Sequence, residues 1–150
     1  MKFILTKELG RLAKWLRIMG FDAVYFKAEN RSLLLIEALR ENRIILTRNQ
    51  KVAKTHGPQV INIKAEDFRG QLRQVLEELK IELDRDKMFS RCVLCNIELD
   101  FIEKDKVKER VPEYVFQTQK VFYICKDCGR IYWQGTHWGN VEKILKEIGN

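Results

Sequence analysis

Four cysteines in two close pairs are the residues of this chain best suited to hold a metal ion. Cys92 and Cys95 form one pair, Cys125 and Cys128 form the other, and 29 residues separate the two pairs. In each C-x2-C pair a tight turn lets two thiolates reach one ion, and two pairs complete a tetrahedral site. Four thiolates leave no open position for water, so we predict a structural zinc site and not a catalytic one. Disulfides or an iron site of rubredoxin type would use the same cysteines.

Positively charged residues form a second set, concentrated in the first part of the chain. Residues 1–64 contain 13 Lys/Arg and 5 Asp/Glu, a net of +8, whereas residues 65–150 contain 15 and 16, a net of −1. At about 100° per residue, one face of the first predicted helix carries Lys7, Arg11, Lys14 and Arg17. A second basic group flanks the third predicted strand and comprises Arg43, Arg48, Lys51 and Lys54. This charge predicts a nucleic-acid partner, and an ordinary solvated surface is the alternative.

The elements that must position these residues alternate between strands and helices. Apolar runs predict strands at residues 2–5, 23–26, 44–47 and 59–63. Amphipathic segments predict helices at residues 6–20, 32–42, 49–57 and 68–81, with Gly20 ending the first and Ser32 capping the second. This alternation indicates parallel βαβ units and hence an α/β fold, a three-layer α/β/α sandwich with a parallel sheet.

The chain changes character near residue 88. Short β-like segments follow at residues 97–102, 114–125 and 130–135, with a charged, solvated arm or loop at 103–110 and a final helix at 141–149. We therefore predict an α/β domain at 1–85 and a small β-rich zinc ribbon with a C-terminal helix at 88–150. A module of this size has little core, and zinc can supply folding free energy on the order of 10 kcal/mol.

Aromatic residues and one histidine surround the end of the ribbon. Tyr132, Trp133 and Trp138 could stack on bases, but a role in the core of the ribbon is favoured. His137 could be a fifth ligand, but with four cysteines available we interpret it as a packing or RNA-facing residue.

Apolar segments are too short for a membrane protein. No stretch approaches the roughly 20 apolar residues of a membrane span, and the N-terminal apolar run is too short for a secretory signal. We expect a soluble, cytoplasmic protein with no membrane partner and no small-molecule cofactor.

Four longer motifs occur in a fixed order: "FILTKELGRLAKWLRIMGFD", "RIILTRN", "FSRCVLCN" and "CKDCGRIYWQGTHW". Together they resemble the Mut-seven C-terminal (Mut7-C) domain family, and the resemblance spans nearly the whole chain. It implies a PIN-like ribonuclease domain followed by a zinc ribbon. It also implies carboxylates at the C-terminal ends of the strands, where Mg²⁺ or Mn²⁺ would activate water for phosphodiester hydrolysis.

The chain departs from the family pattern at two acidic positions. The family has Asp at the end of the first strand and after Leu-Thr-Arg, where this chain has Thr6 and Asn49. Asp22 of "GFD" is kept, and the acidic patch before the second helix is reduced to Glu29. Hard divalent cations need anionic oxygens, which Thr and Asn lack. We therefore predict a degenerate pocket that binds a phosphate backbone better than it cuts one, although Asn49 could also simply cap a helix.

Three functions are compatible with these residues. The preferred one is an RNA-binding protein of PIN-like ribonuclease ancestry, weakly active or inactive, acting on ribosomal or other structured RNA, with the ribosome or another ribonucleoprotein as partner. The first alternative is an active endoribonuclease that uses Asp22 and Glu29, for which alone Mg²⁺ or Mn²⁺ would be a cofactor. The second is an adaptor whose zinc ribbon docks a protein partner.

Overall fold

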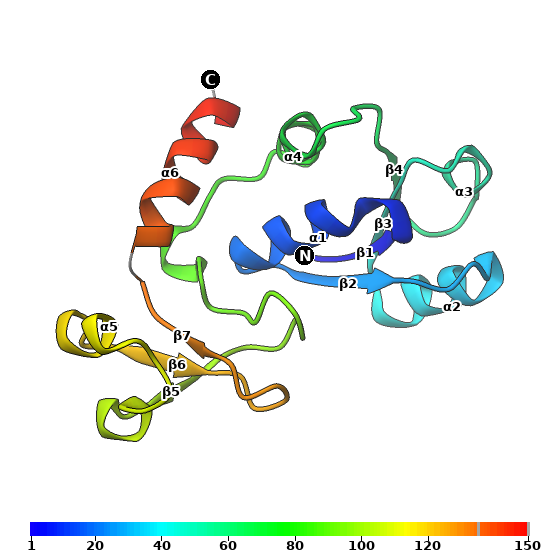
Figure 1. Ribbon diagram of the computed structural model, residues 1–150. Coiled ribbons are helices and arrows are strands. Elements are labelled where there is room, and N and C mark those ends of the chain that lie inside the picture. The colour runs from blue at the N-terminus through cyan, green and yellow to red at the C-terminus, as the bar shows by residue number, and fades with distance from the viewer. Residues whose placement is uncertain (135, 150) are drawn as a thin grey trace.

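Four parallel strands form the sheet of the N-terminal part of the chain (Figure 1). The structure is a computed structural model that describes residues 1–134 and 136–149. The side chains of residues 136–139 lie outside this description, and so do the predictions for His137 and Trp138. The strands, in the spatial order β2-β1-β3-β4, are β1 (Lys2–Thr6), β2 (Asp22–Phe26), β3 (Ile44–Thr47) and β4 (Val60–Asn62). All four strands predicted from the sequence are therefore present.

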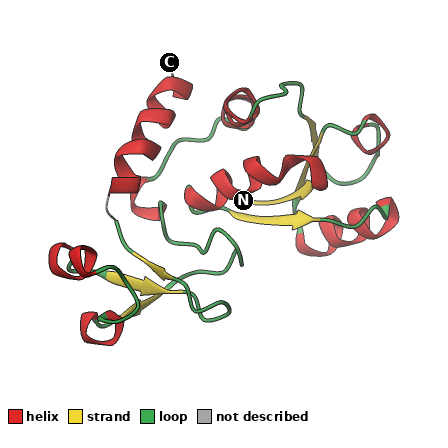
Figure 2. Cartoon of the chain, in the orientation of Figure 1, coloured by secondary structure: helices red, strands yellow, loops and turns green. Residues whose placement is uncertain are grey.

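Helices cover both faces of this sheet (Figure 2). One face carries α1 (Gly10–Ile18), which follows the 3-10 turn η1 (Lys7–Leu9), and α4 (Phe68–Glu78); the other carries α2 (Arg31–Glu41) and α3 (Gln50–Ala53). Phe3 and Leu5 pack with the first pair of helices and Ile4 with the second, and all three are fully buried. Successive side chains of β1 thus point to opposite faces, so the sheet is the middle layer between two layers of helices. The predicted three-layer α/β/α sandwich is confirmed.

The second helix begins earlier than its sequence pattern predicts. Asn30, not Ser32, is the N-cap of α2, and its side chain accepts a hydrogen bond of 3.0 Å from the backbone N–H of Leu33. Ser32 lies inside the helix. Both residue types cap helices well, and the extended backbone of Asn30 (φ −96°, ψ 100°) decides which one does so here.

The ribbon contains a small antiparallel sheet and an unexpected helix. Strands β5 (Asp100–Ile102), β6 (Phe122–Ile124) and β7 (Ile131–Tyr132) pair in that order. Part of the segment predicted to be β-like forms α5 (Glu113–Thr118), and the expected solvated arm contains the 3-10 turn η3 (Lys104–Val107). Val107 and Val115 are buried against Phe122. The β prediction was wrong over Glu113–Thr118, where the packing of Val115 outweighs its β propensity. The arm is not solvated throughout, because Val107 is buried.

The last helix, α6 (Thr136–Gly149), returns to the N-terminal part of the chain (Figure 1). It begins before the predicted residue 141, and Val141, Leu145 and Ile148 join the same core as Leu72 of α4. The Arg73 guanidinium also donates to the Ile148 carbonyl, at 3.2 Å. The domain division at residues 85–88 stays a prediction, and the packing of α6 ties the two parts of the chain together.

Helix length and composition decide whether a helix of this chain could span a membrane. Across residues 1–134 and 136–149, no helix is long and apolar enough to cross a lipid bilayer.

Candidate functional site

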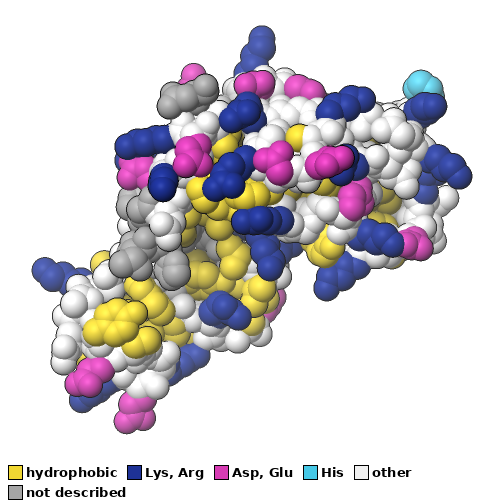
Figure 3. Space-filling view, turned by 45° about the horizontal axis from the view of Figure 1, so that its top comes forward, with side chains coloured by type: hydrophobic (Ala, Val, Ile, Leu, Met, Phe, Trp, Pro, Cys, Tyr) yellow, Lys and Arg dark blue, Asp and Glu magenta, His cyan; other side chains and the backbone are white. Residues whose placement is uncertain are grey.

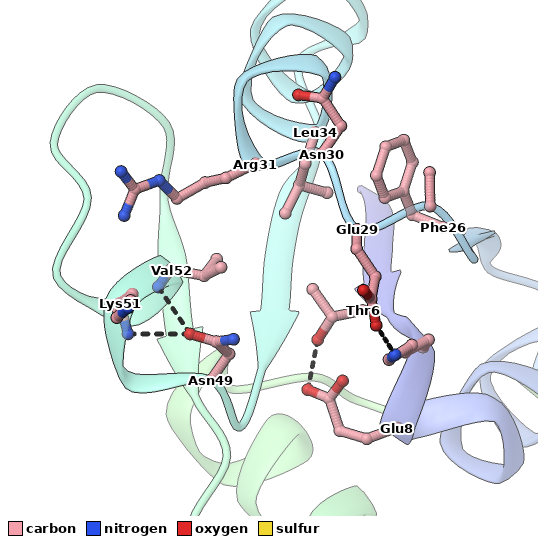
Figure 4. Close-up of a pocket in the computed structure, with 12 residues that line it drawn as sticks. Thr6, Glu8, Phe26, Glu29, Asn30, Arg31, Leu34, Asn49, Lys51 and Val52 are labelled. Carbon is pink, nitrogen blue, oxygen red and sulfur yellow. Dashed lines mark hydrogen bonds and ion pairs between the residues drawn. The ribbon is translucent and has the colours of Figure 1, made fainter.

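A pocket of about 570 Å³ opens where β1 and β3 end (Figure 4). In the order β2-β1-β3-β4, the segments that follow β1 and β3 lead to helices on opposite faces of the sheet. Such a switch point leaves a crevice at the C-terminal edge, which is the usual ligand site of parallel α/β sheets. The polar residues that line it include Thr6, Lys7, Glu8, Glu29, Arg31, Asn49 and Lys51.

Glu8 is the acidic residue of the pocket that the sequence analysis missed. It follows the end of β1 by two residues, in the turn η1. Its carboxylate accepts a hydrogen bond from the Thr6 hydroxyl (Figure 4). It also accepts one of 3.0 Å from the backbone N–H of Arg48. The Thr47 hydroxyl lies 2.9 Å from that of Thr6 and 3.4 Å from the carboxylate. The only sequence signal for Glu8 was its position two residues after a buried strand.

These contacts keep Glu8 ionised. Burial alone would raise the pKa of the Glu8 carboxyl, but the hydrogen bonds from Thr6, from backbone N–H groups and from Thr47 together outweigh it. The pKa of Glu8 is therefore lowered below its ordinary value.

Asn49 caps the short helix α3. Its side-chain oxygen accepts from the backbone N–H groups of Lys51, at 2.9 Å, and Val52, at 3.2 Å (Figure 4). The simple capping role considered from the sequence is therefore present. The carboxamide nitrogen points away from the helix, toward the side of the pocket that holds Thr6 and Glu8 (Figure 4).

Removing this cap has a predictable effect on stability. Asn49→Ala is expected to lower the free energy of unfolding by about 1 kcal/mol, because two backbone N–H groups lose their acceptor. Asn49→Asp, which keeps an acceptor, is the matched control and should retain the wild-type value. Urea denaturation of the three proteins measures the difference, and equal stability of all three would contradict the capping role.

Asp22 does not belong to the pocket, and its prediction as a pocket residue was wrong. It begins β2 and pairs in register with Lys2, the first residue of β1, so it lies at the opposite edge of the parallel sheet. There its carboxylate accepts from the Arg43 guanidinium and from the Asn96 carboxamide, each at 2.7 Å. Its side chain therefore has a structural role between the sheet and the ribbon.

Glu29 does line the pocket, as predicted, but with a cation beside it. Its side chain is 74% exposed and forms an ion pair with Lys7 (Figure 4). Among the described residues that line the pocket, Glu8 and Glu29 are the two carboxylates, whereas Lys7, Arg31 and Lys51 are cations.

Six of the seven predicted RNA-binding residues fall into three groups. Lys7 and Lys51 line the pocket, and Lys54 lies with Lys51 in a neighbouring hollow. Arg11 and Lys14 are exposed on α1. Arg48 is half-buried, and its Nε has no hydrogen-bond partner among the described residues. Figure 3 shows Lys and Arg side chains spread over the N-terminal part on the face that it displays.

Arg17 departs from the predicted exposed stripe. It is only 8% exposed, and its guanidinium donates to the backbone carbonyls of Ala23, Val93 and Leu94, the first two at 2.8 Å. Its assignment as an RNA-binding residue is therefore corrected. The ribbon folds back over this end of α1 and encloses the side chain, which the helical pattern alone could not show.

The four cysteines come together as the sequence predicts. Their sulfur atoms all lie within 4.8 Å of one another, and those of Cys92 and Cys128 are 3.8 Å apart. Tetrahedral zinc with Zn–S bonds of about 2.3 Å places its sulfurs about 3.8 Å apart, so the donor set fits that ion. Burial would raise the pKa of the Cys92 thiol, but the Tyr132 hydroxyl and nearby backbone N–H groups lower it to about 7. The cluster is consistent with a structural zinc ribbon.

Comparisons with known proteins match these features to one family. Residues 1–145 match the family model described as the Mut7-C RNAse domain. No curated protein and no solved structure matches the chain.

Proposed function

The chain belongs to the Mut7-C RNase domain family, and from that premise we propose that it binds RNA at the pocket where β1 and β3 end and has little or no nuclease activity. The family implies a PIN-like ribonuclease ancestry. The fold supports the proposal because the pocket lies at the edge of the sheet where parallel α/β proteins hold their ligands. Ribosomal RNA and other structured RNAs remain candidate ligands within this proposal.

The charge of the pocket is the observation that carries this proposal. The three cations among its described lining residues outnumber the two carboxylates, Glu8 and Glu29. Phosphodiester groups are anions, and neutralising them with Lys and Arg supplies most of the affinity for a nucleic-acid backbone. Thr6 and Asn49 add hydrogen-bonding groups without the negative charge that would repel phosphate.

The same two carboxylates argue against efficient cleavage. A metal-dependent nuclease holds its ions through several anionic oxygens. Glu29 is paired with Lys7, and Glu8 already accepts hydrogen bonds from Thr6 and the Arg48 backbone. Binding a divalent cation would have to compete with these contacts.

Salt-dependent binding tests the proposal. Lys7→Ala combined with Lys51→Ala should weaken binding of a fluorescent single-stranded RNA and reduce the steepness of log K against log salt. The expected reduction is about 1.4, since each lost phosphate contact contributes about 0.7. Lys106→Ala with Lys108→Ala, two exposed ribbon lysines, is the control with the same loss of charge. An equal reduction in this control would mean that the pocket has no special role.

A cleavage assay decides between the proposal and the nuclease alternative. With Mg²⁺ or Mn²⁺ present, we expect the wild-type protein to leave RNA uncut or to cut it slowly. Rapid cutting that Glu8→Gln abolishes would overturn the proposal and assign an endoribonuclease with Glu8 at its centre. Asp22→Asn does not serve this purpose, because Asp22 lies at the other edge of the sheet.

For the four cysteines we propose a structural zinc ion. The support is the closeness of the four sulfurs and the small core of the ribbon around Val107, Val115 and Phe122. Four thiols this close cannot all ionise without a cation, and a bound Zn²⁺ would allow it.

A further inference from the structure

We propose that a second cavity, the groove between α1, β2 and the first cysteine pair, binds nucleotides of the same single-stranded RNA whose backbone occupies the pocket. This inference rests on the proposed function. The groove has a volume of about 860 Å³. Its main lining residues are Arg11, Lys14, Trp15, Tyr25, Lys27 and Leu94.

The groove combines the two chemical properties of a nucleotide-binding surface. Arg11, Lys14 and Lys27 supply positive charge, and no Asp or Glu occurs among its described lining residues. Tyr25 and Leu94 supply aromatic and apolar surface, and Leu94 is 48% exposed. Figure 3 shows apolar side chains in the hollow between the N-terminal part and the ribbon, with Lys and Arg side chains beside them. Single-stranded RNA needs cations for its phosphates and flat apolar surfaces for its bases.

One of these cations is held in place before any ligand binds. The Arg11 guanidinium lies over the Phe68 ring, 3.9 Å from its centroid, and Phe68 stacks on Trp15 at 5.4 Å. An arginine fixed in this way loses little conformational freedom when it meets a phosphate.

The groove and the pocket are lined by neighbouring residues of the same two segments, which favours one ligand for both. Lys7 lines the pocket, and Gly10, three residues later, lines the groove. On β2 and the loop after it, Tyr25 and Lys27 line the groove, whereas Phe26, which points to the opposite face of the strand, and residues 28–31 line the pocket. The Tyr25 hydroxyl donates to the Lys7 carbonyl and so joins the two segments. A strand of RNA leaving the pocket over Lys27 would enter the groove directly.

The ribbon closes the far side of the groove. Val93 and Leu94, between the first two cysteines, line it, and the Arg17 guanidinium holds both of their carbonyls, at 2.8 and 3.3 Å. This contact gives the buried Arg17 a function in positioning, because it keeps Leu94 beside Tyr25 and α1.

An acidic peptide would also satisfy the positive charge, but RNA fits the position better. The shared segments place the groove next to a site proposed for phosphates, and the aromatic ring of Tyr25 in the groove suits a base. We therefore assign the groove to RNA and keep the acidic peptide as an outcome of the test.

Oligouridylates of increasing length, from about 4 to 16 nucleotides, test this assignment. The wild-type affinity should rise with length until both cavities are filled. Tyr25→Leu should weaken binding of the longer RNAs about tenfold more than binding of the shortest one, the effect of one lost base stack. Lys27→Ala, an exposed position that leaves the core intact, should show the same length dependence. Phe101→Leu, which removes a ribbon aromatic ring that is 65% exposed, is the matched control and should have no effect.

Each other result has a defined meaning. If Tyr25→Leu and Lys27→Ala bind all lengths as tightly as the wild type, or lose the same factor at every length, the groove is not an RNA site. If they lose binding to polyglutamate but not to RNA, the groove docks an acidic protein, and the inference is overturned. If the wild type binds no RNA of any length, the proposed function itself fails. Crosslinking of 4-thiouridine RNA to the peptide containing Tyr25 and Lys27 would support the assignment directly.

Discussion

Withdrawing the metal is expected to unfold the ribbon while the four-stranded sheet stays folded. In the described part of the ribbon, the core consists of Val107, Val115 and Phe122 with a few half-buried neighbours. The sheet has its own core, which contains fully buried residues of β1 and β3. A structural Zn²⁺ contributes on the order of 10 kcal/mol to a module of this kind, more than so small a core can replace.

Cys92→Ser or a strong chelator removes the site. We expect proteases to cut the treated protein within residues 90–134 while the fragment that contains β1 to β4 resists. Metal analysis should find one zinc per wild-type chain, and adding excess Zn²⁺ after chelation should restore resistance. Every described cysteine belongs to the cluster, so none outside it can serve for a control substitution. The recovery of resistance on adding Zn²⁺ is therefore the control for specificity. A chelated protein that is shown to be metal-free but keeps its resistance would refute the structural role.

Loss of the ribbon should also affect the pocket and the groove differently. Val93 and Leu94 form a wall of the groove, whereas no residue beyond Val52 is among the described residues lining the pocket. Chelation is therefore expected to weaken the binding of long oligouridylates more than the binding of short ones, as Tyr25→Leu does.

Asp22→Ala is expected to lower the free energy of unfolding by about 2–3 kcal/mol and to leave RNA binding at the pocket unchanged. The substitution removes the carboxylate that pairs with Arg43, whose side chain is only 6% exposed. A buried charge left without its partner costs several kcal/mol. Here a Glu41 carboxylate oxygen, 3.2 Å from the Arg43 Nε, partly compensates for the lost Asp22. The Asn96 carboxamide, which links the ribbon to the sheet, loses its acceptor at the same time.

The stability due to Asp22 should depend on pH with a definite sign. Burial would raise the pKa of Asp22, but hydrogen bonds from Arg43 and Asn96 and the charges of Arg43 and Arg91 lower it below its ordinary value. The contribution is therefore complete above the unfolded pKa of about 3.9 and is lost as the pH falls through the folded pKa.

Urea denaturation between neutral pH and the acid range measures this contribution. Asp22→Asn should be less stable than the wild type at neutral pH, and the difference should shrink as the pH falls below about 3.9. Asp105→Asn, an exposed ribbon position, is the matched control and should follow the wild type throughout. A constant difference at every pH, or none, would contradict the ion-pair role.

Much of the fold, the four-cysteine cluster and part of the pocket could be predicted from the sequence. The four strands follow from local apolar runs, and the four-cysteine cluster follows from two short spacings. Thr6 and Asn49 do line a pocket at the C-terminal edge of the sheet, because Thr6 ends β1 and Asn49 lies two residues after the end of β3, and the pattern identifies both strands. Strands, short cysteine spacings and residues near strand ends depend on residues close together in the chain, so the sequence pattern can reveal them.

The tertiary structure decided which charged residues lie close together and which of them are buried. The parallel pairing of Lys2 with Asp22 puts that aspartate at the wrong edge for the pocket, while η1 turns Glu8 into it. Arg17 has the helical position of an exposed cation, yet the ribbon carbonyls of Val93 and Leu94 enclose it. Strand register and the packing of one module on another join residues far apart in the chain. For that reason the sequence alone determined the fold class and the four-cysteine cluster, whereas the folded chain determined the full lining of the pocket, the groove and the roles of Glu8, Asp22 and Arg17.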